Sequence, residues 1–434
     1  MRIEDFHNFD SYDMKDSVDF SKPLDVCLFS NYKMFKNAIN IIISDVKYDI
    51  GSSFNRYKKK YIKFIKIVIL NVFEAWKRHE YLYISYSRDS SRYQPGTRYS
   101  KLFISYKPLI RVIDSLIKIG YIKNVLGYYD RVTGESRQSR MRATDKLINK
   151  FLYYKLNINM VERNNNDLII LRDHDKNDIE YKITQFIKSK KCNVRKINRF
   201  IAKHKLTFNA SPSIVRKMYR KSIQFPNTNM FGLTRIYNES FEQGGRFYRG
   251  WWQGLPSEFR QYIQINGNKV TELDYASIHP YLLYAKKGLA MPANDMYSID
   301  GMSKKERRIA KVILLTIFNI NKDQDPIKPI LYEMNWNKGI ELNKDEALHI
   351  LNKLKDKHKP ISEFFASGVG GNLQRIDSDI AENIMLRLME QNIVSLPIHD
   401  SFIVQKEYSS NLHQAMIEEA QNITGQLPRI DKKY

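Results

Sequence analysis

The pattern of apolar and polar residues predicts a mainly helical first part of the chain. Between residues 56 and 81, apolar residues recur at helical spacing among many lysines, which predicts one long basic helix. A solvated helix face is the simplest explanation of its lysines. In YKPLIRVIDSLIKIGYI, an apolar stripe predicts a second helix that Gly120 ends. The stripe consists of Leu109, Val112, Ile113, Leu116 and Ile117.

The stretch after this second helix predicts a β-hairpin. In KNVLGYYDRVTGESRQSRMRAT, apolar residues flank a DRVTGE turn and several arginines follow. A helix followed by a basic hairpin is typical of a winged helix, whose helix approaches a duplex groove while arginines reach phosphates. An exposed hairpin with incidental arginines remains the alternative. The arginines concerned are Arg131, Arg137, Arg140 and Arg142.

The pattern changes to short strands in the C-terminal part. The segment VTELDYASIHPYLLYA predicts a strand that ends at Asp274 and is followed by a helix. Farther on, IVSLPI and FIVQ predict two strands joined by a tight turn that contains Asp400. Between them, SKKERRIAKVILLTIFNINK predicts a helix. Arg307 and Lys311 are four residues apart on it, so they project from one face.

Length and charge point to a folded protein that binds a polyanion. The 434 residues, 43% hydrophobic and 27% charged, are enough for two or three packed units with their own cores. A net charge of +24 and a pI near 9.6 favour nucleic acid as the partner, because arginines and aromatics accompany the lysines. Codon bias of an AT-rich genome is the simpler explanation, and a membrane surface is a weaker competitor.

Cysteine usage and the N-terminal sequence indicate a cytoplasmic protein. Cys27 and Cys192 are far apart and lack a metal-ligand pattern, which argues against a disulfide framework and a zinc site. The first residues do not combine a basic region with an apolar stretch, so no signal peptide is expected. The apolar run FIKIVILNVF is too short to span a bilayer. The sequence does not indicate an oligomeric state.

The strand-end carboxylates suggest metal chemistry. A buried aspartate needs a cation or a metal as partner. If the hairpin lies beside the first strand, Asp274 and Asp400 converge and can hold two Mg²⁺ ions, for which Mn²⁺ can substitute. Arg307 and Lys311 would then clamp a triphosphate, although such a pair alone is usually a solvated face. Residues farther along that helix would form a surface against base and sugar: Leu315, Phe318 and Asn319.

In this order, the segments resemble the palm and fingers of family A DNA polymerases and single-subunit phage-type RNA polymerases. DYASIHPY resembles the first metal-binding motif, which implies Asp274 and the Tyr275 carbonyl as metal ligands. RRIAKVILLTIFN is similar to the fingers helix and aligns Arg307 and Lys311 with its triphosphate-binding residues. LPIHDSFIV resembles the second metal motif, closest to the RNA-polymerase branch, and implies Asp400 as a ligand.

Two further segments extend the resemblance, which covers the chain from about Gly244 onward. GGRFYRGWWQGLP resembles the segment leading into the palm, which implies that Arg246 contacts template or primer. NLQRIDSDIAENIMLRLMEQ resembles the helix before the second metal motif, with Gln374 and Asp377 facing the growing end. His399, beside the second metal aspartate, is placed to contact the primer terminus.

The departures from the family pattern concern sugar selection and proofreading. In the DNA enzymes a glutamate blocks the ribose 2′-hydroxyl where this chain has His279, which we assign to the nucleotide site with a structural histidine as the alternative. The family's fingers tyrosine is replaced by Asn319. DYASIHP also resembles family B polymerases, but HDS lacks their paired aspartates. No acidic exonuclease pattern is found in the N-terminal half. Glu272 is a candidate third acid, and its alternation with Leu273 suggests the opposite strand face.

The sequence therefore predicts an α+β protein with a right-hand polymerase-like palm and fingers. Three parts are expected: a basic, mainly helical region with a winged helix (1–160), a helical connecting region (161–243) and a palm/fingers nucleotidyltransferase domain (244–434). The predicted function is template-directed polymerisation on a DNA or RNA primer–template from nucleoside triphosphates, with a DNA polymerase slightly preferred over an RNA polymerase or primase. The alternative is a nucleic-acid-binding initiator or regulator with a non-catalytic palm. A phage or other mobile element is the setting suggested by size.

Overall fold

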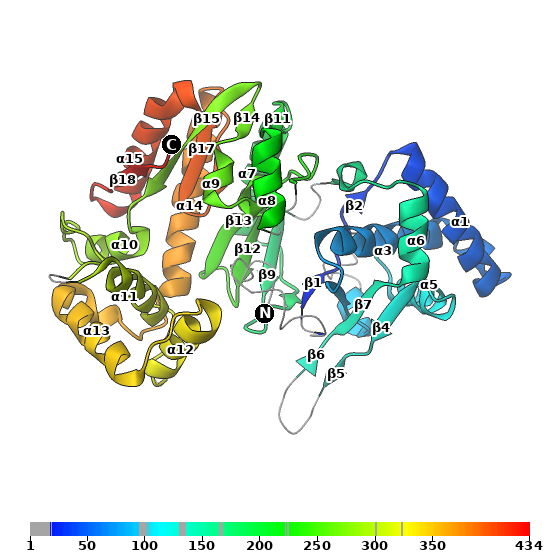
Figure 1. Ribbon diagram of the computed structural model, residues 1–434, viewed down its shortest axis with the longest axis horizontal. Coiled ribbons are helices and arrows are strands. Elements are labelled where there is room, and N and C mark those ends of the chain that lie inside the picture. Colours follow the sequence, from blue (N-terminus) through cyan, green and yellow to red (C-terminus); the bar gives the residue numbers. More distant parts are fainter. Residues whose placement is uncertain are drawn as a thin grey trace. The chain divides into compact units, whose positions relative to one another are not determined.

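The computed structural model describes residues 18, 20–94, 102, 104–129, 136–164, 168–221, 223, 225–299, 302–322 and 324–434. The chain forms two compact units, each with helices and sheets (Figure 1). Unit 1 comprises Met1–Asp167, Glu180–Lys182 and Pro212–Gly232. Unit 2 comprises Leu168–Ile179, Ile183–Ser211 and Leu233–Tyr434. The segment predicted as a separate connecting region therefore contributes to both units.

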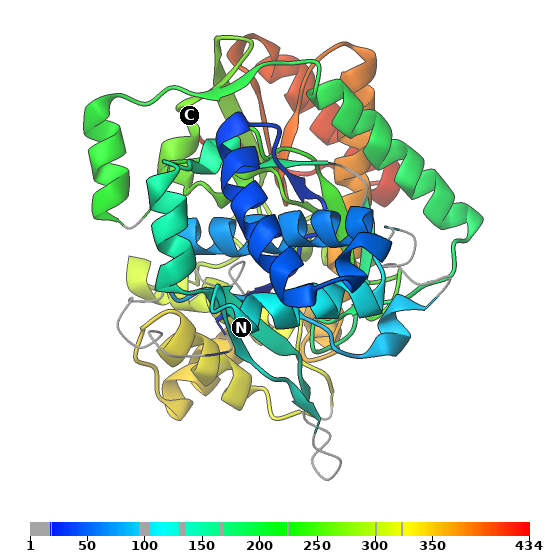
Figure 2. The same ribbon diagram turned by 90° about the vertical axis from the view of Figure 1, so that its right-hand side faces the viewer.

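Unit 1 is built around the helix α3 (Lys58–Arg78), which confirms the predicted long basic helix. Residues 67–75 of α3 are buried without interruption, so this half of the helix is core rather than a solvated surface. The helices α1 (Lys33–Ile50) and α5 (Tyr106–Lys118) pack against it (Figure 2). Four residues of the predicted stripe of α5 are buried and Ile117 is half-buried, and Gly120 follows the helix with a φ of 81°.

The four-stranded sheet of unit 1 has the strand order β1-β3-β7-β4, and its β4–β7 pair is the predicted hairpin; β2 pairs separately with β8. The short strands β5 and β6 extend this hairpin, whereas its predicted turn, with Arg131, lies outside the described residues. The bounds in unit 1 are β1 (Ser21–Pro23), β2 (Leu28–Phe29), β3 (Tyr83–Tyr86), β4 (Ile122–Val125), β5 (Tyr128–Tyr129), β6 (Ser136–Arg137), β7 (Ser139–Ala143), β8 (Glu162–Arg163), α2 (Ser53–Arg56), α6 (Asp145–Tyr153) and α8 (Pro212–Arg220).

The described residues of unit 2 form two sheets. The first has the order β10-β9-β12-β13, and the second has the order β11-β14-β15-β17-β16, with β18 also paired to β15. The helix α14 packs on β13, and α15 packs on β15 and β17. The bounds are β9 (Ile169–Arg172), β10 (Asp178–Ile179), β11 (Leu206–Phe208), β12 (Thr234–Asn238), β13 (Gly244–Tyr248), β14 (Ile263–Ile265), β15 (Asn268–Tyr275), β16 (Leu396–Ile398), β17 (Ser401–Gln405), β18 (Ile430–Lys432), α7 (Gln185–Ile201), α14 (Gly370–Glu390) and α15 (Ser409–Thr424).

Two tight turns set the register of the second sheet. Asn266 and Gly267 have positive φ angles of 53° and 85° and join β14 to β15, which is the typical Asn-Gly hairpin turn. His399, with a φ of 57°, and Asp400 join β16 to β17. The strands predicted on both sides of Asp400 are therefore confirmed.

The remaining helices of unit 2 are α9 (Ser257–Arg260), α10 (Ile278–Lys286), α11 (Lys304–Ile317), α12 (Ile327–Tyr332) and α13 (Lys344–Lys357). The predicted helix α11 begins with a capping box, in which Ser303 and Glu306 bond each other's backbone N–H groups at 3.2 and 2.8 Å. It packs against α12 and α13. No helix in the described part of the chain combines the length and apolar character needed to cross a bilayer.

Candidate active site

Asp274 and Asp400 lie next to each other at one end of the β15–β17 pair. Asp274 is paired with Ser401 in the antiparallel register, and the N–H of Tyr275 donates to the carbonyl of Asp400 at 3.2 Å. Two aspartates far apart in the sequence are thus brought to one place by the sheet. The predicted convergence of the hairpin with the first strand is observed.

The charges of the two carboxylates interact. Burial, and next the negative charge of Asp400, raise the pKa of Asp274 from 3.8 to about 6. Lys433 opposes this shift, with its Nζ 3.2 Å from Asp274 Oδ2. A carboxylate whose pKa is raised by burial and by a second carboxylate is a favourable position for a cation.

Glu272 lies on the same side of β15 as Asp274, so the suggestion that it faces the opposite side is wrong. Lys433 Nζ is 2.9 Å from Glu272 Oε1 and bridges it to Asp274. Glu272 is fully buried and also accepts bonds from Arg260 at 2.8 Å and Ser401 at 2.9 Å. The Glu272 carboxylate is therefore already bonded to Lys433, Arg260 and Ser401. No three His, Cys, Asp or Glu side chains among the described residues are grouped as ligands of one metal ion.

Two strained backbone positions flank the aspartates. Ser277, three residues after Asp274, has a φ of 60°, and His399, directly before Asp400, has a φ of 57°. A left-handed conformation at a residue other than glycine costs about 1–3 kcal/mol, and such positions are concentrated at functional sites. The surrounding structure therefore holds the two turns next to the carboxylates against this cost.

Arg246, Asp377 and His279 form one buried cluster. Arg246 Nε donates to Asp377 Oδ1 at 3.1 Å, and His279 Nε2 lies 3.2 Å from both Asp377 Oδ2 and an Arg246 nitrogen. Burial raises the pKa of Asp377, but the charge of Arg246 and hydrogen bonds from both partners lower it overall. Asp377 and His279 are 3% and 8% exposed, so they orient Arg246 rather than present an open surface.

Arg246 connects this cluster to the carboxylates. Burial lowers its pKa, but the negative charges of Asp377 and Asp400 raise it overall. Gly244 and Gly245, with φ angles of 74° and 80°, let β13 approach α14 at this point, because a Cβ at Gly245 would lie 2.9 Å from Ser378 Oγ. The double glycine of the GGRFY motif thus places Arg246 beside α14. Gln374, one turn before Asp377, is half-buried.

The basic pair of α11 meets a tyrosine that the sequence did not single out. The Arg307 guanidinium and the Lys311 ammonium lie 5.8 and 5.2 Å from the centre of the Tyr297 ring. Burial and next the charge of Asp400 are among the influences that raise the pKa of Tyr297, while a hydrogen bond with Ser277 opposes them. Tyr297 therefore lies beside the cations of α11 and within the electrostatic influence of Asp400. Arg307 also forms an ion pair with Asp295.

Phe318 differs from the prediction for the end of α11. Its ring is fully buried and packs edge-on against Phe365 with ring centres 5.6 Å apart, so it offers no surface to a nucleotide. Phe318 keeps a helical conformation directly after Ile317 and lies four residues beyond the buried Leu314, so it continues the buried face of α11. Leu315 is half-buried, and Asn319 is exposed with its amide bonded to the Leu315 carbonyl at 2.8 Å.

Trp252 packs against the β16–β17 hairpin that carries Asp400. Trp252 Nε1 donates to the Pro397 carbonyl at 3.0 Å, and Trp252 is fully buried, so it belongs to the core. The His399 ring lies 5.5 Å from that of Tyr248, edge to face. The side chain of Tyr275 is buried and its hydroxyl bonds the Met416 carbonyl at 2.5 Å.

The hairpin arginines of unit 1 are less free than the sequence suggested. Arg137 lies over the Tyr128 ring at 5.2 Å, and Arg142 lies over the rings of Tyr83 and Tyr81 at 5.0 and 5.6 Å. Arg140 donates to the carbonyl of Gln138 at 2.8 Å. These partners hold the guanidinium groups along the hairpin.

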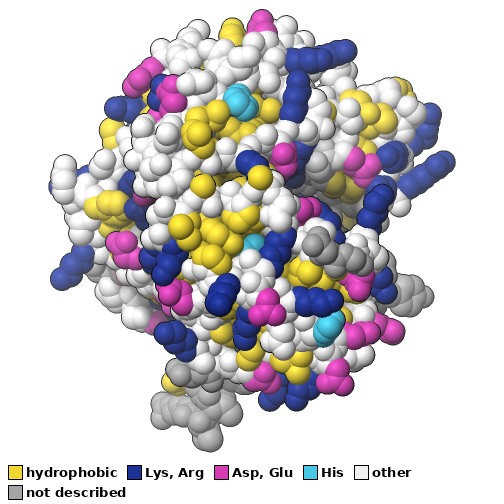
Figure 3. All heavy atoms as spheres, turned by 90° about the vertical axis from the view of Figure 1, so that its left-hand side faces the viewer, with side chains coloured by type: hydrophobic (Ala, Val, Ile, Leu, Met, Phe, Trp, Pro, Cys, Tyr) yellow, Lys and Arg dark blue, Asp and Glu magenta, His cyan; other side chains and the backbone are white. Residues whose placement is uncertain are grey.

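Charge is distributed unevenly along the chain. Residues 181–238 contain 14 Lys and Arg residues and no Asp or Glu, a signal that sequence reasoning left unassigned. On the face shown in Figure 3, by contrast, Lys and Arg side chains are spread among acidic and hydrophobic ones. The net charge alone does not mark a binding groove on that face, so the candidate site is defined by its contacts.

Comparison with known proteins yields little. No family model and no curated protein match the sequence. Among solved structures, the chain is similar to the POL domain of Pol1 from M. smegmatis in complex with DNA primer-template and dNTP, at 10% sequence identity and a TM-score of 0.32. The match covers 92% of this chain and 69% of that chain. A similarity this low does not establish a shared fold.

Proposed function

We propose that this protein is a template-directed nucleic-acid polymerase that adds nucleotides to a 3′-hydroxyl, with a DNA polymerase slightly preferred over an RNA polymerase or primase. The observation that carries the proposal is the meeting of Asp274 and Asp400 at one end of β15 and β17. The cations of α11 lie beside Tyr297, whose pKa the charge of Asp400 helps to raise after burial. A carboxylate pair beside a basic helix is suited to nucleotidyl transfer.

The donor set fits divalent metal ions. Burial, and next the negative charge of Asp400, raise the pKa of Asp274, and a cation between the two carboxylates removes their repulsion. Mg²⁺ suits such a site, because it takes a few carboxylate oxygens and completes its shell with water and substrate phosphates. Asp274, Asp400 and the Tyr275 carbonyl would hold two Mg²⁺ ions, which would activate the 3′-hydroxyl and stabilise the leaving pyrophosphate.

The chain's own groups bind and orient the substrates. Lys311 and Arg307 bind the triphosphate, with Arg307 exchanging its partner Asp295 for phosphate oxygens. Arg246, held rigid by Asp377 and His279, contacts the primer–template close to the growing end. Positioning and electrostatic stabilisation therefore supply the acceleration.

Primer extension tests the proposal. The full chain is incubated with Mg²⁺, a labelled primer on a template, and either ribonucleotides or deoxyribonucleotides. Asp274→Asn and Asp400→Asn should each abolish extension while binding of the primer–template remains, because the substitution removes charge and conserves shape. Asp356→Asn, at an exposed position of α13, is the matched control and should extend normally. Extension by either active-site variant at the control rate would refute the proposal.

A nucleic-acid-binding initiator or regulator is the second candidate, and unit 1 favours it. There, the helix α5 precedes the β4–β7 hairpin, and β3 pairs with the other edge of β7, an arrangement suited to a winged helix. Tyr128 and Tyr129 of the hairpin extension are 50% and 68% exposed. A regulator would shift nucleic acid in a gel and yield no extension product with any nucleotide set.

A further inference from the structure

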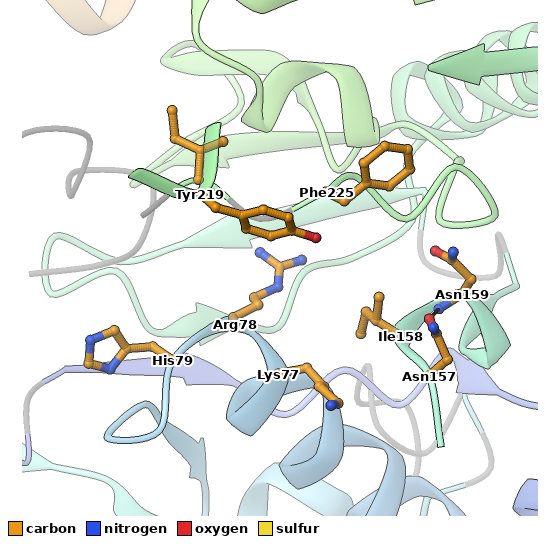
Figure 4. Close-up of a pocket in the computed structure, with 9 residues that line it drawn as sticks. Lys77, Arg78, His79, Asn157, Ile158, Asn159, Tyr219 and Phe225 are labelled. Atoms are coloured by element: carbon orange, nitrogen blue, oxygen red, sulfur yellow. Dashed lines mark hydrogen bonds between the residues drawn. The ribbon is translucent and has the colours of Figure 1, made fainter. Parts of the chain in front are cut away.

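A pocket of about 620 Å³ lies within unit 1, whereas the carboxylates belong to unit 2 (Figure 4). Its volume is within the usual range of small-molecule sites. Three segments of the chain line it: the end of α3 with Lys77, Arg78 and His79, the turn with Asn157, Ile158 and Asn159, and the segment from α8 onward with Tyr219, Ile223 and Phe225.

The walls of the pocket are joined by hydrogen bonds. Asn227 Nδ2 donates to the carbonyls of Ile158 and Val161 at 2.7 and 2.9 Å, and Asn229 Nδ2 donates to that of Asn159 at 2.7 Å. The segment after α8 is thereby fixed to the turn opposite. The pocket is part of the fold of unit 1 and does not depend on a second unit.

The lining is cationic and contains no acidic residue. Lys77 and Arg78 occupy the last turn of α3, where cations also complement the helix dipole, so their position alone does not indicate a ligand. Two further observations do. Burial lowers the pKa of Lys77, whose ammonium lies 4.3 Å from the centre of the Trp76 ring, and among the described residues no carboxylate forms an ion pair with it. The Arg78 guanidinium is directed toward Tyr219, while its Nε turns back to Glu74 (Figure 4).

The rest of the lining suits an aromatic ring. Tyr219 and Phe225 face the pocket from one side and Ile158 from another (Figure 4), so a planar base can be sandwiched against apolar surface. Arg78 offers the forked geometry that matches phosphate oxygens. Arg216 and Arg220 on α8 are exposed and extend the cationic surface beyond the pocket.

We propose that this pocket binds a nucleoside phosphate, either as a free nucleotide or as the 5′-phosphorylated end of a nucleic-acid strand. Both sources present the same chemistry, one base ring with a phosphate next to it. The site is separate from the nucleotide site proposed above and does not rest on the polymerase function.

Binding by the full chain in EDTA tests the proposal, because metal-dependent binding at the carboxylates is then suppressed. Oligonucleotides labelled at the 3′ end, with either a 5′-phosphate or a 5′-hydroxyl, are compared by fluorescence polarisation, with and without AMP as competitor. The phosphorylated strand should bind about tenfold more tightly, as expected for one charge-assisted contact, or AMP should displace the probe. A preference for the 5′-phosphorylated strand assigns the site to strand ends, and displacement of both probes by AMP without such a preference assigns it to free nucleotides.

Two variants and two controls locate the effect. Tyr219→Ala, at a position 58% exposed, and Arg78→Met should lose the preference or the displacement. Tyr153→Ala, at a position 79% exposed, and Lys66→Met on the exposed side of α3 should retain it. Equal binding of both strands without competition by AMP would overturn the proposal, and so would an unchanged preference in both Tyr219→Ala and Arg78→Met.

Discussion

The buried guanidinium of Arg235 provides the clearest test of how the candidate active site is supported. Arg235 is fully buried on β12 and donates to Glu382 Oε2, Ser378 Oγ and the Gly245 carbonyl at 2.7 Å each. It thereby ties β12 to α14 and to the residue before Arg246. Arg235→Met keeps most of the volume and removes these donors.

Removing one partner of a buried ion pair typically costs 3–5 kcal/mol, because a charge is left buried without compensation. Glu382, 1% exposed, retains Lys190 as a partner, so a loss of about 3 kcal/mol at the lower end of that range is expected. Replacing both residues, in Arg235→Met with Glu382→Leu, should cost less than Arg235→Met alone, since the buried, under-compensated Glu382 carboxylate is then absent and Asp379 keeps Lys190 and Arg375 as partners.

Hydrogen exchange measured by mass spectrometry is the suitable assay, because two units make a single unfolding transition unsafe to assume. Peptides from β12 and α14 of Arg235→Met should exchange on the order of 10²-fold faster, which corresponds to about 3 kcal/mol, while peptides from α3 in unit 1 stay unchanged. The reasoning would be refuted if β12 and α14 exchanged at the wild-type rate in Arg235→Met. It would also be refuted if these peptides exchanged faster in the double variant than in Arg235→Met.

Three further outcomes are expected. Lys311→Met should lower kcat/KM for the incoming nucleotide by about 10- to 100-fold in steady-state extension, because one charge-assisted phosphate contact is lost. In metal-free buffer, the stabilising contribution of protonated Asp274 is present below its unfolded pKa near 4 and is lost as pH rises through about 6. Asp274→Asn should therefore become more stable than wild type as pH rises from 4 to 7, by at most about 3 kcal/mol in chemical denaturation. Replacing Tyr128 and Tyr129 by alanine should weaken single-strand binding by about 1–3 kcal/mol per stacked base, while Tyr48→Ala, at a position 92% exposed, should leave it unchanged in the same polarisation titration.

Local patterns accounted for the elements that carry the site. Helical spacing predicted α3, α5 and α11, and turn residues predicted the hairpin at Asp400, because these features depend on residues close in sequence. The resemblance to polymerase motifs predicted that Asp274 and Asp400 lie close together. The side of the strand on which Glu272 lies was misjudged, although residues two apart in a strand share a face.

The features of the site and fold that the sequence did not predict depend mostly on contacts between segments far apart in the chain. Lys433 and Tyr297 reach the site from segments with no motif, so nothing local marks them. By contrast, the burial of Phe318 was predictable from local spacing, because Phe318 lies four residues after the buried Leu314 on the same face of α11. The division into two units follows contacts between distant segments, which periodicity does not encode.

The most direct test of the central claim is the position of a bound metal ion. Crystals of the protein with a primer–template and a non-hydrolysable nucleotide, grown with Mn²⁺, allow anomalous scattering to locate the metal. The account predicts anomalous density bridging the carboxylates of Asp274 and Asp400 and adjoining the triphosphate. Density that adjoins neither aspartate, or these two carboxylates turned away from each other, would contradict it.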